Sequence, residues 1–185
     1  MKKTLTMILA FALVFALGVG GTLAWLTDKT EEVTNVFTSS DINVTLTEAN
    51  PTVKNDIKMV PGLEIAKNPK AKVEAGSEPC WLFVKVEYNA EANEFLTWSV
   101  DTAWGTAIET GEGYAVYAKK IDTAEKMNVE YSILTGDKVT VKTGITKADM
   151  TENFTEPELT FTAYASQLMN NTTEFTAAQA WANID

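Results

Sequence analysis

The chain has no histidine, no arginine and a single cysteine among its 185 residues. The missing histidine excludes Ser-His-Asp and Cys-His catalysis, and every zinc site that needs an imidazole ligand. The missing arginine removes the planar fork that reads bases and holds phosphates. The lone cysteine, Cys80, has no partner for a disulfide within the chain. It opens an apolar run at residues 80–84, so we interpret it as a small buried hydrophobe rather than a reactive thiol.

The chain also has few cations for its many anions. Its 15 basic residues are all lysine, against 25 acidic residues, which gives a formal net charge of −10. An acidic surface without arginine repels nucleic-acid phosphates and anionic lipid headgroups. We therefore expect no nucleic-acid partner and no electrostatic docking to a membrane. A strong negative charge does help an exported protein to stay in solution.

The first 24 residues have the layout of a secretory signal peptide. Lys2 and Lys3 form a short basic start, residues 4–19 are almost wholly apolar, and Thr22 and Ala24 are small residues at the −3 and −1 positions of a cleavage site. The predicted cut lies between Ala24 and Trp25. We therefore expect the chain to contact the membrane only through its signal peptide, before cleavage. The alternative is an uncleaved anchor, because residues 4–27 carry no charge and are long enough to span a bilayer.

The rest of the chain divides into a polar leader and one domain. Residues 25–40 are threonine-rich, with a weak strand pattern at residues 33–37, and residues 41–185 hold the stronger strand patterns. A chain of this length can bury a normal core without disulfides. An exported protein without an internal disulfide suits a Gram-positive cell surface, so we expect a secreted protein of the cell surface or extracellular matrix.

Short runs with alternating apolar and polar residues predict a mainly β domain, an antiparallel sandwich. Residues 81–88 give the clearest strand, with Leu82, Val84 and Val86 on one face, and we place it in the middle of a sheet. The other expected strands are at residues 42–47, 96–100, 114–118, 129–134, 139–141 and 159–166.

Few helices are expected. Residues 90–95 fit one helical turn, and residues 145–154 fit either a helix or a loop. Thr176 and Gln179 match a capping box, which predicts a C-terminal helix. Trp181 and Ile184 lie on one face of it, and we expect this helix to plug one end of the sandwich.

No residue is predicted to be catalytic or to bind a cofactor or metal. Acidic pairs such as Asp122 and Glu125 could bind calcium, but no calcium-loop motif is present, and solvated surface charge is the better interpretation. Trp81, Trp98 and Trp104 could form a platform for stacking sugars, although packing in the core is the more common use of tryptophan.

Several segments, in the same order along the chain, resemble the TasA/camelysin family of Firmicutes. The junction at residues 20–28 (Gly-Gly-Thr-Leu-Ala-Trp-Leu-Thr-Asp) resembles the cleavage region of that family. Weaker similarities follow at residues 35–38, 41–46, 60–62, 67–69, 81–88, 159–165 and 180–181.

The resemblance implies a jelly-roll-like sandwich, export through a SipW-type signal peptidase, and a role as a fibre subunit of the biofilm matrix. It also implies that residues 25–40 can add as a donor strand to the next copy of the same protein, with Val33, Val36 and Phe37 filling the acceptor groove. The partners expected are thus the signal peptidase and the chain itself.

Two other functions stay open. One is a monomeric surface module that binds a wall polymer or glycan. The other, an enzyme, is the weakest, because camelysin-type proteins have been labelled metallopeptidases while this chain has no histidine for a zinc site.

Overall fold

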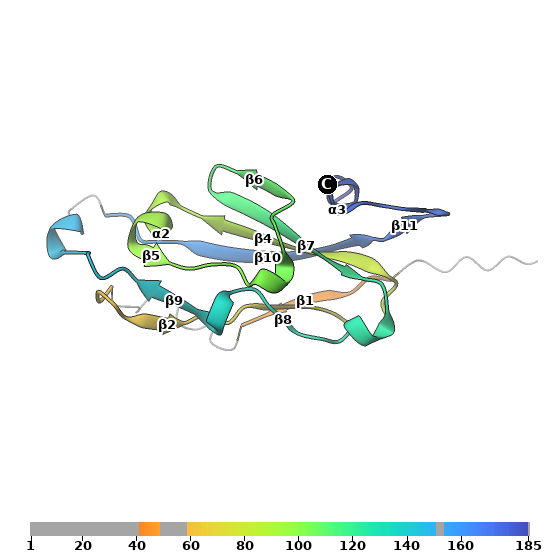
Figure 1. Cartoon of the computed structure of the whole chain (residues 1–185), viewed down its shortest axis with the longest axis horizontal. Coiled ribbons are helices and arrows are strands. Elements are labelled where there is room, and N and C mark those ends of the chain that lie inside the picture. Colours follow the sequence, from red (N-terminus) through yellow and green to blue (C-terminus); the bar gives the residue numbers. More distant parts are fainter. Residues whose placement is uncertain (1–40, 49–58, 151–153, 185) are drawn as a thin grey trace, which may run out of the picture. The chain divides into compact units, whose positions relative to one another are not determined.

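Short antiparallel strands are the main secondary structure of the described part of the chain, and the mainly β prediction is confirmed (Figure 1). This computed structural model describes residues 41–48, 59–150 and 154–184. The predicted signal peptide, its cut between Ala24 and Trp25, and the predicted donor residues Val33, Val36 and Phe37 lie outside the described residues.

A four-stranded sheet forms the first layer. Its strands are β4 (Cys80–Tyr88), β6 (Glu109–Gly111), β7 (Tyr114–Ile121) and β10 (Leu159–Gln167), in the order β10-β4-β7-β6. As the alternating pattern predicted, β4 lies in the interior of the sheet, antiparallel to β10 on one side and to β7 on the other. Aromatic and β-branched residues favour this extended conformation because their side chains pack well on a pleated surface.

Two three-stranded sheets form the second layer. One has the order β1-β3-β8 and the other β2-β9-β5. The strands are β1 (Val44–Thr47), β2 (Glu64–Ala66), β3 (Lys70–Val73), β5 (Leu96–Thr97), β8 (Tyr131–Ser132) and β9 (Lys138–Val141). Two layers of antiparallel strands are consistent with the predicted sandwich. The jelly-roll connectivity stays a prediction.

Short elements join and cover the sheets. They are a hairpin of β11 (Met169–Asn170) and β12 (Thr173–Glu174), the helices α2 (Ala90–Phe95) and α3 (Ala177–Trp181), and the 3-10 turns η1 (Thr102–Trp104), η2 (Ala124–Lys126), η3 (Thr135–Asp137) and η4 (Lys147–Asp149). Helix α2 follows the predicted turn, and the side chain of Asn89 caps it by accepting the N–H of Ala92 at 2.9 Å.

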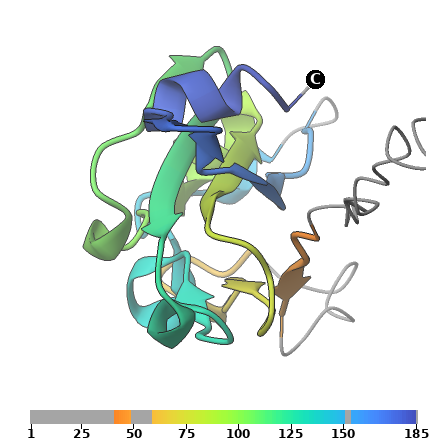
Figure 2. The same cartoon turned by 90° about the vertical axis from the view of Figure 1, so that its right-hand side faces the viewer.

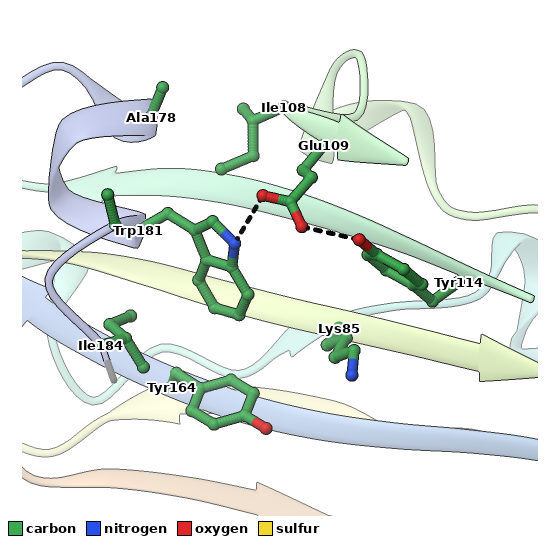
Figure 3. Close-up of a pocket in the computed structure, with 9 residues that line it drawn as sticks. Lys85, Ile108, Glu109, Tyr114, Tyr164, Ala178, Trp181 and Ile184 are labelled. Carbon is green, nitrogen blue, oxygen red and sulfur yellow. Dashed lines mark hydrogen bonds between the residues drawn. The ribbon is translucent and has the colours of Figure 1, made fainter. Parts of the chain in front are cut away.

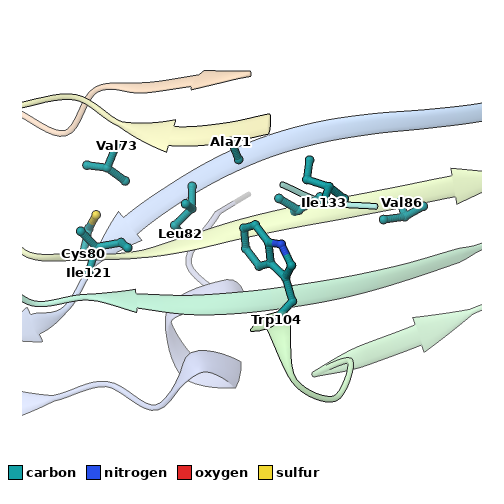
Figure 4. Close-up of a cluster of buried hydrophobic side chains, with 9 residues drawn as sticks. Ala71, Val73, Cys80, Leu82, Val86, Trp104, Ile121 and Ile133 are labelled. Atoms are coloured by element: carbon teal, nitrogen blue, oxygen red, sulfur yellow. The ribbon is translucent and has the colours of Figure 1, made fainter. Parts of the chain in front are cut away.

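The main core lies between the four-stranded sheet and the sheet β1-β3-β8 (Figure 4). Leu82, Val84 and Val86 from β4 face Ala71 and Val73 from β3, and all five are fully buried. Cys80, Trp104, Ile121 and Ile133 complete the cluster. The alternation of β4 thus places one apolar row in the core, as predicted.

The strand predicted at residues 129–134 is only partly correct. Only Tyr131 and Ser132 pair with β3, and the chain then changes partners. The N–H of Ile133 donates to the carbonyl of Pro69 at 3.0 Å, while Leu134 forms an isolated bridge with Val100. The apolar pattern at residues 129–134 therefore indicates burial, but these residues do not form one continuous ladder with β3.

The C-terminal helix has the predicted capping box but not the predicted position. Thr176 and Gln179 exchange the two capping bonds at the start of α3. The helix packs on the outward face of the four-stranded sheet, where Ala180 meets Phe83 and Val116 in a second apolar cluster. It lies there because β4 carries aromatic residues on its outward face too, and that face must be covered.

Substituting one buried valine should test the main core. Val84→Ala removes two methyl groups from a side chain with 0% exposure, so we expect the free energy of unfolding in urea to fall by about 2 kcal/mol. Val60→Ala makes the same change at 49% exposure and should cost less than about 0.5 kcal/mol. Equal losses for the two variants would contradict the core assignment.

Candidate functional site: a seam between two edge strands

Strands β1 and β10 are edge strands on the same side of the sandwich. In the described residues, β10 pairs only with β4 and β1 pairs only with β3. The two strands contact each other across the layers, and β1 lies at the margin of its layer (Figure 2, orange). Each leaves one row of backbone N–H and C=O groups that no described strand pairs. We call the strip between these two edges the β1–β10 seam.

Apolar side chains are partly exposed along the seam. Phe161, Ala163 and Ala165 of β10 point toward the core but are only half-buried, although their partners on β4 are fully buried. On the other side of the seam, Val44 is half-buried and Leu46 is 38% exposed. These partly exposed side chains are therefore accessible to an additional apolar side chain along this edge.

The opposite side of the same sandwich is closed. Trp104 of η1 covers the side where β7 and β8 lie, and it is only 3% exposed. Its indole N–H donates to the carbonyl of Ser132 at 2.8 Å. Lys119 donates to the carbonyl of Ala103 at 2.6 Å and lies over the ring of Trp104. Burial lowers the pKa of the Lys119 ammonium. The contrast shows that the β1–β10 seam lacks a comparable cover among the described residues.

The two ends of the seam are lined differently. At one end, Lys67 forms an ion pair with Glu48 at 3.2 Å and lies over the ring of Phe161 at 5.4 Å from its centroid. At the other end lies a hollow of about 600 Å³, lined in part by Ile42 and Ala165. The nine-residue strand β10 runs between these ends.

The arrangement can bind an extended peptide. A strand that pairs with β10 would satisfy its outer backbone groups and place alternate side chains over the open core. Sequence patterns place Phe161, Ala163 and Ala165 on one face of a strand, yet they do not show that this strand is an edge. The missing information is the strand order, which depends on contacts between residues far apart in the chain.

The three tryptophans considered for a sugar platform do not lie together. Trp81 is on the outward face of β4, where its indole N–H donates to the carbonyl of Phe175 at 2.9 Å. Trp98 packs against Tyr88 at 5.3 Å, and Trp104 is buried in the main core. A platform of these three residues is therefore wrong, because they belong to different faces of the sheet.

The acidic pairs are held by local partners. Asp122 accepts from Lys126 at 2.6 Å, and this bond lowers the pKa of its carboxyl. Asp149 accepts from the backbone and hydroxyl of Thr146, which lowers its pKa as well. Within the ranges that the structure describes, no group of three or more Cys, Asp or Glu side chains could hold a metal ion.

Comparisons with known proteins add no relative. Scans of protein-family models, curated proteins and solved structures each give no match to the chain. Among the described residues, no helix is long and apolar enough to cross a membrane. The seam therefore has to be interpreted from its own geometry.

The lone cysteine should be unreactive in the folded protein. Cys80 has 0% exposure, and burial raises the pKa of its thiol to about 11, so very little thiolate forms near neutral pH. We expect no labelling by Ellman's reagent at about pH 8 in buffer and complete labelling after unfolding in urea. Rapid labelling of the folded protein in buffer would contradict this burial.

Proposed function

We propose that the chain is an exported structural subunit that assembles into a fibre outside the cell. In this proposal, residues 25–40 of one copy add as a strand to the β1–β10 seam of the next copy. The observation that carries it is the seam itself, which combines half-buried apolar side chains with a nine-residue edge that no other described strand pairs. Edges of this kind are commonly covered or charged in proteins that stay monomeric.

The proposed donor has a suitable pattern. In an extended strand, Val33 and Phe37 lie on the same face, about 13 Å apart, and Val36 lies on the other face. Val33 and Phe37 can then enter the open core while Val36 packs outside it. The donor segment also has no proline that would interrupt the new ladder.

Head-to-tail strand addition does not close on itself. Each copy offers one donor and one acceptor, so addition continues into a filament rather than ending at a dimer. Removal of residues 1–24 by a SipW-type signal peptidase would free the donor only after export. The resemblance to the TasA/camelysin family supports the same role, and secretion to the matrix or cell surface follows from it.

The alternative is a monomeric surface module that binds a wall polymer or glycan. A pocket beneath α3, lined by the rings of Tyr114, Tyr164 and Trp181, favours this alternative. An enzyme receives less support. Three described carboxyls have shifted pKa values, and in each case the pKa is lowered: Glu74, Asp122 and Asp149. A general acid needs a raised pKa, so that it holds its proton near neutral pH.

Removing the proposed donor should abolish assembly. We expect fibres in negative-stain electron microscopy from a protein covering residues 25–185 and none from one that starts at Asp41. The double variant Val36→Asp/Phe37→Asp should also form none, because the charge at position 37 cannot enter an apolar seam. Thr34→Asp/Thr38→Asp adds the same charge on the other face of the donor strand without removing an apolar side chain, and it should still assemble.

Fibres from the protein that starts at Asp41, or from the Val36→Asp/Phe37→Asp variant, would contradict donation by residues 25–40. If the 25–185 protein forms no fibres at any salt concentration or pH tried, the monomeric module becomes the better proposal.

Crosslinking should show that donor and acceptor belong to different copies. Phe37→Cys in one preparation and Ala163→Cys or Ala165→Cys in another should form a mixed disulfide when the two are combined, because strand addition brings these positions together. Cys80 is buried and should not interfere. The exposed Val60→Cys is the matched control. If a double variant with both Phe37→Cys and Ala163→Cys instead forms a disulfide within one chain at high dilution, the segment pairs inside its own subunit.

A further inference from the structure

A pocket of about 530 Å³ lies on the outward face of the four-stranded sheet, beneath α3 (Figure 3). It is separate from the seam, which opens toward the inward face. Its size is in the range of small-molecule sites. The rings of Tyr114, Tyr164 and Trp181 line it, together with Glu109 and Lys85.

The strand register explains why these side chains meet. Lys85 on β4 lies opposite Val116 on β7, and Val116 lies opposite Glu109 on β6. Tyr164 on β10 lies opposite Phe83, one outward position along from Lys85. Residues two apart share a face of a strand, so four strands direct these side chains to the same side of the sheet. Helix α3 adds Trp181 from above.

Hydrogen bonds fix the centre of the pocket. The Tyr114 hydroxyl donates to Glu109 Oε1 at 2.9 Å, and the Trp181 indole N–H donates to Glu109 Oε2 at 3.0 Å. Figure 3 shows the carboxylate between these two rings. A carboxylate has about four acceptor sites, so two remain for a ligand. The bond to Glu109 raises the pKa of the Tyr114 hydroxyl, which therefore remains a donor at neutral pH.

Packing fixes the aromatic rings. Trp181 contacts Tyr164 with ring centroids 5.4 Å apart, nearly perpendicular, and contacts Phe83 at 5.3 Å. Phe83 is fully buried. The Trp181 indole is thus held by two rings and one hydrogen bond, and it needs no reorganisation before it can stack on a ligand.

Lys85 supplies hydrogen-bond donors without making the pocket positive. Its ammonium donates to Glu87 at 2.7 Å and lies over the Tyr114 ring at 5.1 Å from the centroid. The bond to Glu87 raises the pKa of Lys85, so the charge is kept at neutral pH. An ammonium has three donors, which leaves capacity for the oxygen of a ligand.

We propose that this pocket binds a neutral sugar chain. The flat apolar face of a pyranose can stack on the rings, while its hydroxyls donate to Glu109 and accept from Lys85. An anionic chain would meet the Glu109 carboxylate and the net charge of −10. A neutral chain avoids this repulsion and uses both polar groups.

The test is an NMR titration of the full chain, purified from a secreting host, with cellotetraose and chitotetraose at up to ~10 mM. The Trp181 indole N–H resonance is the reporter. We expect it to shift with both neutral sugars, and not with the anionic tetramer of galacturonic acid. An unmoved resonance with both neutral sugars, or stronger binding of the anionic tetramer, would overturn the proposal.

A matched pair of variants separates this site from general effects of charge. Glu109→Gln should weaken binding of the neutral sugar by roughly tenfold, because it replaces a charged acceptor with an amide. Glu112→Gln makes the same change at an exposed residue that does not line the pocket, and its affinity should match that of the unmodified protein. Thermal unfolding shows whether each variant is folded. Equal affinities for the two variants would also overturn the proposal.

Discussion

The structure depends on one strand, β4, being buried on both of its faces. Leu82, Val84 and Val86 pack inward against β3, while Phe83 packs outward against α3. Because β4 also pairs along both edges, its neighbours β10 and β7 are fixed in register by its nine residues. The inward row creates a sandwich core, and the outward row requires the C-terminal helix as a cover. The β1–β10 seam lies beside the inward row of β4, and the pocket beneath α3 lies beside its outward row.

The two sides of the sandwich differ in how their edges are covered by the described residues, and this difference distinguishes the β1–β10 seam. One side has Trp104 and Lys119 as a polar and aromatic cover, with hydrogen bonds to backbone carbonyls. The other side has small or half-buried side chains on β10, chiefly Ala163 and Ala165. Small residues leave room for side chains from a further strand, whereas large ones would fill the edge themselves. The described residues thus cover one edge of the core and leave the edge along β10 without a comparable cover.

Local sequence patterns predicted the elements better than their arrangement. Alternation identified β4 and β10, and the capping box identified α3, because these signals depend on neighbouring residues. The position of α3 could not be predicted, since it depends on which face of β4 remains uncovered. The sequence did not predict the pocket beneath α3 for the same reason. Its residues come from four strands and a helix, and only the strand register brings them together. The donor segment lies outside the described residues.

The two proposed surfaces share strand β10, and this has a consequence for a fibre. Tyr164 points outward into the pocket, while its neighbours Ala163 and Ala165 point inward to the seam. A strand added to β10 would therefore lie beside the pocket, so each junction between subunits would carry one sugar site. A fibre repeats that site along its length, and a long polysaccharide could contact several copies at once. Weak binding at each site would then become strong attachment, because later contacts form at a high effective concentration.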